Sequence, residues 1–273
     1  MNTIATAPEI DVLKTRLKRT WMAGDYDRFS RSMENEARSF YERLDVPPGA
    51  HLLDVACGSG QLALIAAREG VRVTGVDIAE SLIERAQARS TAEGLPALFQ
   101  VADAETLPFE DASFDVVVSL IGAMFAPRPD LVARELTRVC APGGAIAMAN
   151  WTAEGFVGKM FRTIAKFIAP SGMPSPLLWG DEAVVQERLG SEVCDLRPAR
   201  RHYIFDYPFP PSEVVNFFRL YYGPVNRAFA SLHRAGRKNL HQELEAIWSA
   251  HNRGQAGFTL VAAEYLEVIA TRA

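Results

Sequence analysis

An apolar segment that ends in a glycine-containing turn constrains this chain more than any other feature. Residues 51–60 read His-Leu-Leu-Asp-Val-Ala-Cys-Gly-Ser-Gly, so a short strand carrying an acid at Asp54 leads directly into a turn of small residues. Gly58 and Gly60 permit backbone conformations, and a closeness of approach, that a side chain would prevent. The pattern predicts a βαβ unit whose first loop holds a ligand against the main chain at the start of a helix.

A second strand follows at the spacing that nucleotide-binding units require. The segment 71–77 is mostly apolar and ends in Asp77, about 20 positions after the first glycine of the turn. A carboxylate at that point is placed to bind the ribose hydroxyls of a nucleotide. Each piece also has a purely structural reading, in which the glycines form a tight turn and Asp77 caps the next helix. We favour the ligand site because three features coincide in register.

The residues around the turn restrict which cofactor it can hold. Gly58-Ser-Gly-Gln-Leu-Ala63 also fits the G-x-G-x-x-A pattern of nicotinamide-dependent dehydrogenases, so an NAD(P)-dependent oxidoreductase is one alternative. However, the Asp54 carboxylate would repel a pyrophosphate. The sequence also has no Tyr-x-x-x-Lys pair and no G-x-x-x-x-G-K-[ST] loop. A cofactor with an adenosine end, a positive centre and no phosphates, such as S-adenosylmethionine, fits better.

Further blocks along the chain complete a family pattern. These blocks are Asp103-Ala-Glu105, Ser113-Phe-Asp-Val-Val-Val-Ser119 and Arg138-Val-Cys-Ala-Pro-Gly-Gly144. Together with Asp54–Gly60 and Val76-Asp-Ile78, the chain resembles the class I S-adenosylmethionine-dependent methyltransferases, in particular the ubiquinone/menaquinone-type methyltransferase-domain proteins. The resemblance is strong over residues 20–150 and weak beyond them. Ala56 departs from the pattern, because many members carry glycine there.

The resemblance implies an α/β fold with a doubly wound, mostly parallel, seven-stranded Rossmann-like sheet and an antiparallel last strand. Periodicity predicts strands near 97–102, 114–120, 144–151, 199–206 and 264–271, and a helix that ends at Pro142-Gly143-Gly144. We divide the chain into an N-terminal helical lid (1–46), a cofactor-binding core (47–151) and a remainder (152–273). That remainder holds substrate-covering helical insertions, after strands five and six, and the last two strands.

The resemblance also assigns the cofactor-binding residues. The turn, including Ala56, Gly58 and Gly60, would line the methionine portion, and Asp54 would orient its amino group directly or through water. Asp77 would take the ribose hydroxyls, and Ile78 would pack against the adenine. Asp103 and the Ala104 amide would bind the adenine edge, and Ser119 and Leu120 would border the transferring methyl group. Asp103 could instead cap a turn.

The acceptor side is much less defined. Trp21, Tyr26 and Phe29 resemble an N-terminal lid, although an aromatic trio is also typical of a core. Phe125 and Tyr221 are further candidates for lid or substrate contact, and we assign no catalytic base. We therefore predict a methyltransferase acting on a small molecule, with the acceptor atom (O, N or C) open. The alternatives are a non-catalytic, S-adenosylmethionine-binding regulatory protein and, more distantly, the oxidoreductase.

Composition limits partners and compartment. A net charge of −4 and an isoelectric point near 5.8 provide no global attraction for nucleic acid. The arginines of the segment 197–201 are interpreted first as a solvated strand edge and second as an anion contact. Three cysteines without a C-x-x-C pair indicate a reducing compartment and no metal site. We expect a cytoplasmic protein without integral membrane association, and leave open whether it is a monomer or a homodimer.

Overall fold

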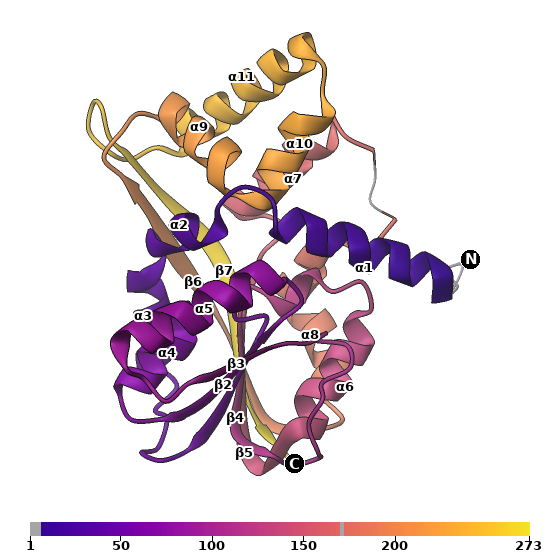
Figure 1. The fold of residues 1–273 in the computed structure, drawn as a ribbon. Helices are drawn as coiled ribbons and strands as arrows, with labels where there is room; N and C mark the ends of the chain where they lie inside the picture. Colours follow the sequence, from indigo (N-terminus) through magenta and orange to yellow (C-terminus); the bar gives the residue numbers. More distant parts are fainter. Residues whose placement is uncertain (1–6, 170–171) are drawn as a thin grey trace.

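The computed structural model describes residues 7–169 and 172–273, which form a seven-stranded sheet with helices on both faces (Figure 1). The strand order is β3-β2-β1-β4-β5-β7-β6, and the sheet is doubly wound and mostly parallel, as predicted. The strands are β1 (His51–Val55), β2 (Arg72–Asp77), β3 (Leu98–Val101), β4 (Phe114–Leu120), β5 (Cys140–Trp151), β6 (Val193–Tyr207) and β7 (Thr259–Arg272).

The parallel half of the sheet forms because its central strands are apolar on both sides. Leu53 of β1 pairs with Thr74 of β2 on one side and with Val117 of β4 on the other, and both leucines of β1 are fully buried. Such continuous apolar strands require helices on both faces of the sheet. The reversal of strand order between β1 and β4 leaves a crevice at their carboxyl ends, which is where this type of sheet binds ligands.

Helices of three groups surround the sheet. The helices α3, α4 and α5 cover one face and α6 and α8 the other, while α1, α2, α7 and α9–α11 lie around the carboxyl ends of the strands (Figure 1). The helices are α1 (Ala7–Trp21), α2 (Tyr26–Arg31), α3 (Glu34–Glu42), α4 (Gln61–Arg68), α5 (Glu80–Glu93), α6 (Pro129–Val139), α7 (Phe156–Ala165), α8 (Glu182–Leu189), α9 (Pro211–Tyr221), α10 (Gly223–Ser231) and α11 (Arg234–His251), with short 3₁₀ turns η1 (Ala123–Phe125) and η2 (Pro176–Gly180).

The last strand, β7, runs antiparallel to both β5 and β6, as the resemblance implied. The hairpin of β6 and β7 is longer than expected and extends beside α9 and α11 (Figure 1). The arginines of the segment 197–201 lie on β6, the edge strand, where Arg200 pairs with Glu182 and Glu264 and Arg201 pairs with Glu267. Charged side chains are a common protection of an exposed sheet edge.

One expectation about local structure was wrong, and two short helices were not predicted. The helix predicted to end at residues 142–144 ends at Val139, and strand β5 already begins at Cys140. Gly143 has a φ of 76°, and the pairing register of β4 with β5 shifts beside it, so the glycines serve an irregularity in the strand rather than a helix end. The short helices α8 and α10 were not expected. The Asp181 side chain caps α8 by accepting from the amides of Ala183 and Val184 at 2.9 and 3.2 Å.

The N-terminal segment serves two purposes. The helices α1 and α2 lie over the carboxyl ends of the strands, whereas α3 packs on α4, with Ala37 and Phe40 buried. Arg43, just after α3, forms an ion pair with the buried Glu267 of β7 at 2.6 Å. Of this segment, only α1 and α2 lie where a lid was predicted, and its role as a lid stays a prediction; residues 1–6 lie outside the described residues.

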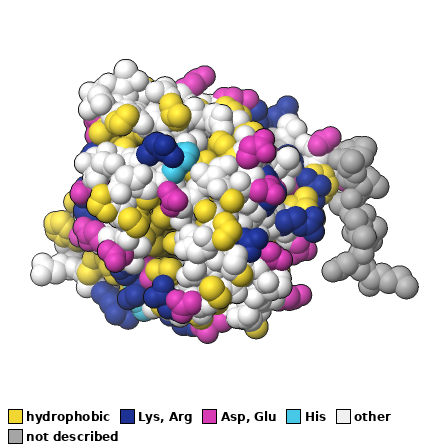
Figure 2. Space-filling view, turned by 90° about the horizontal axis from the view of Figure 1, so that it is seen from below, with side chains coloured by type: hydrophobic (Ala, Val, Ile, Leu, Met, Phe, Trp, Pro, Cys, Tyr) yellow, Lys and Arg dark blue, Asp and Glu magenta, His cyan; other side chains and the backbone are white. Residues whose placement is uncertain are grey.

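Two surface properties complete the description. Seen from the end of the sheet opposite α9–α11, acidic and basic side chains are interspersed over the surface (Figure 2). Within the part of the chain that the structure describes, no helix is both long enough and apolar enough to span a membrane.

Candidate active site

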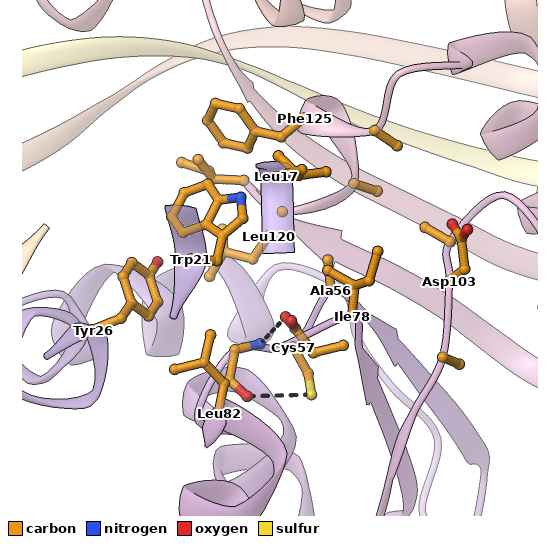
Figure 3. A pocket seen from close by; sticks show the side chains of 18 of the residues that line it. Leu17, Trp21, Tyr26, Ala56, Cys57, Ile78, Leu82, Asp103, Leu120 and Phe125 are labelled. Carbon is orange, nitrogen blue, oxygen red and sulfur yellow. Dashed lines mark hydrogen bonds between the residues drawn. The ribbon is translucent and has the colours of Figure 1, made fainter. Parts of the chain in front are cut away.

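A cavity of about 750 Å³, counted with the space open to solvent, lies at the carboxyl ends of β1, β2 and β4 (Figure 3). The helix α1 forms its roof and the glycine turn its floor. The lining residues are Lys14, Leu17, Trp21, Tyr26, Ala56, Cys57, Gly58, Gln61, Asp77, Ile78, Leu82, Ala102, Asp103, Ala104, Leu120, Ile121, Gly122, Ala123, Phe125, Ala126 and Pro127.

The turn after β1 is held in a conformation that favours glycine at its centre. Gly58 has a φ of 57°, and a Cβ atom there would stand 3.2 Å from the Tyr26 ring, which is tighter than ordinary packing. Ala56 and Ile121 are not glycines but also have positive φ values, 57° and 59°. Strain of this kind persists only where the surroundings enforce it, and it clusters at ligand sites.

Asp77, at the end of β2, ties the second strand to this turn. One carboxylate oxygen accepts the Gly58 N–H and the other accepts the Ala79 N–H, each at 2.9 Å. Burial raises the pKa of Asp77, while these backbone donors act in the opposite direction. A carboxylate oxygen has two lone-pair sites, so both oxygens can still accept a ligand hydroxyl. Asp77 therefore fixes the turn and also presents acceptors to the cavity.

Ion pairs from α1 close the cavity beside Asp103. Lys14 pairs with Asp103 and, at 2.6 Å, with the buried Glu105. Glu105 also accepts from the backbone and side-chain nitrogens of Arg128 at 2.6 and 2.7 Å. A second pair joins Lys18 to Glu80 on α5. The roof helix is thus attached on two sides, and the Asp103 carboxylate is shared between α1 and the cavity.

Asp54 lies behind the turn rather than on the cavity wall. It is 2% exposed, and its carboxyl accepts the Ala63 N–H of α4 at 3.2 Å. Burial, reinforced by the charge of Asp77, raises the pKa of Asp54 to about 8. At neutral pH this acid is therefore largely protonated. Any contact with a ligand has to pass through the backbone of the turn or through water.

Two other predicted cofactor residues also stand behind the wall. Ser119 donates to the Val55 carbonyl at 2.8 Å and accepts from the Ala123 amide at 2.9 Å, so it joins β4 to β1 and to η1. Gly60, with a φ of 83°, precedes α4 and packs against Phe99 and Ala86. Both residues shape the loops that line the cavity. The remaining predicted cofactor residues, Ala56, Gly58, Asp77, Ile78, Asp103, Ala104 and Leu120, line it directly.

The aromatic candidates divide among three positions. Trp21, Tyr26 and Phe125 line the cavity, and Figure 3 shows Trp21 and Phe125 together on the side opposite Ala56 and Ile78. Phe29 lines an adjoining, smaller cavity instead. Tyr221 lines neither, since its ring lies under the Arg28 guanidinium at 4.6 Å.

Several lining residues were missed by the sequence reasoning. Lys14 and Leu17 lie in a helix whose sequence carries no motif. Gln61 follows the glycine turn directly, so its position could have been inferred, and its amide donates to Ser59 at 2.7 Å and also to Ser30. These bonds fasten α2 to the turn. The loop 121–127 follows β4 and could have been included because the carboxyl ends of parallel strands share one edge.

The lining fits an adenosyl sulfonium cofactor better than a phosphorylated one. Asp77 and Asp103 supply carboxylates at separate points, and among the lining residues the only cationic side chain, Lys14, is already paired. An anionic pyrophosphate would be repelled there, whereas ribose hydroxyls and an adenine amino group would find acceptors.

Comparisons with known proteins identify a methyltransferase domain in this chain. A family model described as "Methyltransferase domain" matches residues 53–148. An uncharacterized protein of Mycobacterium tuberculosis is 38% identical over 229 residues, which is 83% of this chain and 84% of the relative. Methyltransferase GfsG of Streptomyces halstedii is 37% identical, covering 47% of this chain and 48% of that protein. A 2-methyl-6-phytyl-1,4-hydroquinone methyltransferase of Synechocystis is 41% identical over 39% of this chain and 33% of its own length, which is only loose support for the quinone-type label.

Solved structures share the fold at low sequence identity. The YcgJ protein of Bacillus subtilis has a TM-score of 0.61 and 17% identity, and the match covers 87% of this chain and 98% of that one. A phosphoethanolamine N-methyltransferase of Haemonchus contortus, solved with S-adenosylhomocysteine, has a TM-score of 0.58 and 18% identity over 87% of this chain and 52% of that one. Residues 53–148 therefore form a domain of the methyltransferase-domain family, which implies S-adenosylmethionine as the cofactor, and the chain as a whole has the fold of these enzymes.

Proposed function

We propose that this protein is an active methyltransferase that methylates a small molecule held beside the sulfonium end of the cofactor. The observation that carries the proposal is the bond between Asp77 and the Gly58 amide, because it places a carboxylate and the glycine turn on one cavity floor. The bound cofactor supplies an electrophilic methyl group. The chain has to position the acceptor and exclude water.

The residues divide the binding task by position. Asp77 would accept the ribose hydroxyls, and Ile78 would pack against the adenine. Asp103 and the Ala104 amide would bind the adenine edge, while the turn at Ala56 and Gly58 would line the methionine portion. The methyl group would then face Leu120, Trp21 and Phe125. Holding two reactants in attack geometry can lower a barrier by about 7–11 kcal/mol. A lone pair of the acceptor atom would form the new bond to the methyl carbon while the S–CH3 bond breaks with its electron pair on sulfur, and a proton carried by the acceptor atom would leave to solvent.

The roof helix would exclude water from this geometry. Its attachment through Lys14 and Lys18 covers the adenosine end, and Trp21 at its last residue covers the methyl end. Tyr26 of α2 brings a hydroxyl to the cavity wall, but burial, together with the charge of Asp77, raises the pKa of this hydroxyl. It would therefore stay protonated and act as a hydrogen-bond donor rather than as a base.

Two measurements test the proposal. Isothermal titration calorimetry should detect binding of S-adenosylhomocysteine and no comparable binding of NAD. Methyl-labelled S-adenosylmethionine, incubated with the protein and a small-molecule extract of the source cells, should transfer label to a compound that mass spectrometry then identifies. Binding without any transfer would favour a regulatory, non-catalytic protein, and preference for NAD would favour an oxidoreductase.

A further inference from the structure

A second cavity adjoins the cofactor cavity and shares four residues with it, Trp21, Tyr26, Ile121 and Phe125. Its empty volume, counted with the space open to solvent, is about 340 Å³. Its lining residues are Trp21, Tyr26, Phe29, Met33, Ile121, Phe125, Trp151, Val157, Met160, Phe205, Phe218 and Tyr222. The shared residues place it directly beside the predicted methyl end.

The wall of this second cavity is almost entirely aromatic. Eight of its twelve lining residues are aromatic, and none is charged. The rings support one another: Phe29 stands 4.8 Å from Tyr222 and 4.9 Å from Phe218, and Trp21 stands 5.0 Å from Phe125. They come from α1, α2, η1, β5, β6 and α9 and from the residue after α9, so the cavity exists only in the folded protein.

The few polar atoms of the wall can donate hydrogen bonds but cannot balance a charge. They are two indole N–H groups, of Trp21 and Trp151, and two phenol hydroxyls, of Tyr26 and Tyr222. Burial raises the pKa of both tyrosines. Neutral phenols can bind an oxygen or nitrogen of a ligand, yet neither an anion nor a cation would find an opposite charge among the lining side chains.

The energetics favour a neutral occupant. Moving an unpaired ion from water into an apolar site carries a large desolvation penalty. Aromatic faces attract cations, but this attraction is smaller than that penalty. A flat neutral molecule meets no such penalty and can stack on the rings.

We propose that the methyl acceptor is an uncharged, planar, predominantly apolar molecule that occupies this aromatic cavity. This proposal rests on the proposed methyltransferase function and adds the substrate class. The acceptor lies among Trp151, Phe205 and Phe218, with its nucleophilic atom toward the shared residues Trp21 and Phe125. Acceptors that carry a carboxylate, phosphate or ammonium group on the ring system are excluded by desolvation.

Three naphthalene probes with the same ring and different charge test this class. They are 2-naphthol (neutral), 2-naphthoate (anionic) and 2-naphthylmethylammonium (cationic), each titrated at pH 7 into protein saturated with S-adenosylhomocysteine. We expect 2-naphthol to bind at least ten-fold more tightly than either ion. Equal or tighter binding of an ion, or no binding of 2-naphthol to the saturated protein, would overturn the proposal.

Substitutions then locate the probe. Val157→Phe should fill the cavity and abolish 2-naphthol binding. Phe218→Leu should weaken binding several-fold, whereas Phe217→Leu, at the adjacent position of α9 but outside the cavity wall, should leave it unchanged. Affinity for S-adenosylhomocysteine is measured for every variant and should stay within two-fold of the parent, which shows that the fold and the cofactor site are intact.

The cofactor measurement separates the two proposals. A parent protein that fails to bind S-adenosylhomocysteine contradicts the proposed function itself. If the cofactor product binds but 2-naphthol affinity is unaffected by Val157→Phe, the aromatic cavity is not the acceptor site and only the further inference is lost.

Discussion

The two ends of the combined cavity are built in different ways. The donor end, around Asp77 and Asp103, is polar, carries carboxylates and is closed by the Lys14 ion pair. The acceptor end, around Phe205 and Phe218, has no charged lining residue. In the proposed function, the donor end would recognise a cofactor common to a family, whereas the acceptor end would select by shape and by desolvation. The predictions below test this division, from the largest expected effect to the smallest.

Loss of the Asp77 charge should have the largest effect on the donor end. Asp77→Asn has the same shape but replaces one acceptor oxygen by an NH2 donor. It therefore weakens the proposed bonds to ribose and loses one of the two backbone bonds that hold the turn, and bonds to charged groups contribute about 1.5–3 kcal/mol each. We expect the affinity for S-adenosylhomocysteine to fall about 100-fold by calorimetry. Glu84→Gln on the exposed side of α5 is the control and should change nothing. An Asp77→Asn protein with parental affinity would show that the ribose does not bind to Asp77.

The buried acid Asp54, behind the turn of the donor end, should make the stability of the folded protein depend on pH. Burial raises its pKa in the folded protein to about 8 from the usual 3.8, so between these values the unfolded chain releases a proton that the folded chain retains. Stability therefore falls as pH rises through this window, by about 1.4 kcal/mol per pH unit. Between pH 5 and 7, urea denaturation should show a loss of about 2–3 kcal/mol relative to Asp54→Asn. A difference that does not change with pH would mean that Asp54 is ionised in the folded protein.

The conformation of the glycine turn gives a third test. Gly58→Ala and Gly70→Ala both place a side chain at positive φ, but only Gly58 faces the Tyr26 ring, since nothing lies within 4 Å of a Cβ at Gly70. Both variants should lose about 1 kcal/mol of stability. Only Gly58→Ala should also lose about ten-fold in affinity for S-adenosylhomocysteine, equivalent to about 1.4 kcal/mol. Equal affinities in the two variants would show that the turn does not touch the cofactor.

The smallest effect is expected at the roof. Lys14→Met removes the ion pairs with Asp103 and Glu105, so α1 should open more readily. Arg128 still pairs with the buried Glu105, so the variant leaves no buried carboxylate without a partner, and stopped-flow dissociation of S-adenosylhomocysteine should accelerate only a few-fold. Lys166→Met, which breaks an exposed pair with Glu243 far from the cavity, is the matched control. An unchanged dissociation rate in Lys14→Met would show that α1 does not retain the cofactor.

The same division explains what the sequence could predict. The fold and the donor end depend on short, ordered segments: the turn at Gly58, the acid Asp77 at a strand end and the acid Asp103 after the next strand. These signals are local, so seven of the ten predicted cofactor residues line the cavity. Asp54, Gly60 and Ser119 do not, because the sequence places a residue on a strand or loop without showing which side of it faces the ligand.

The acceptor end could not be predicted in the same way. Trp151 lies more than 50 residues before Phe205 in the sequence, and Phe218 lies on a further element. Each of the three looks like an ordinary core residue on its own element. Their convergence depends on how α9 and the long β6–β7 hairpin pack over the sheet. Tyr221 and Tyr222 show why the sequence was not sufficient. They are adjacent aromatic residues at the end of α9, yet only Tyr222 lines the aromatic cavity.

The crystal structure of the complex with S-adenosylhomocysteine tests the central claim most directly, because that claim concerns which end of the cavity holds which part of the ligand. We predict that both ribose hydroxyls lie within hydrogen-bond distance of the Asp77 carboxylate and that the sulfur faces Trp21 and Phe125, with the aromatic cavity beyond it. A ribose bound away from Asp77, or a sulfur directed away from the aromatic residues, would contradict the account.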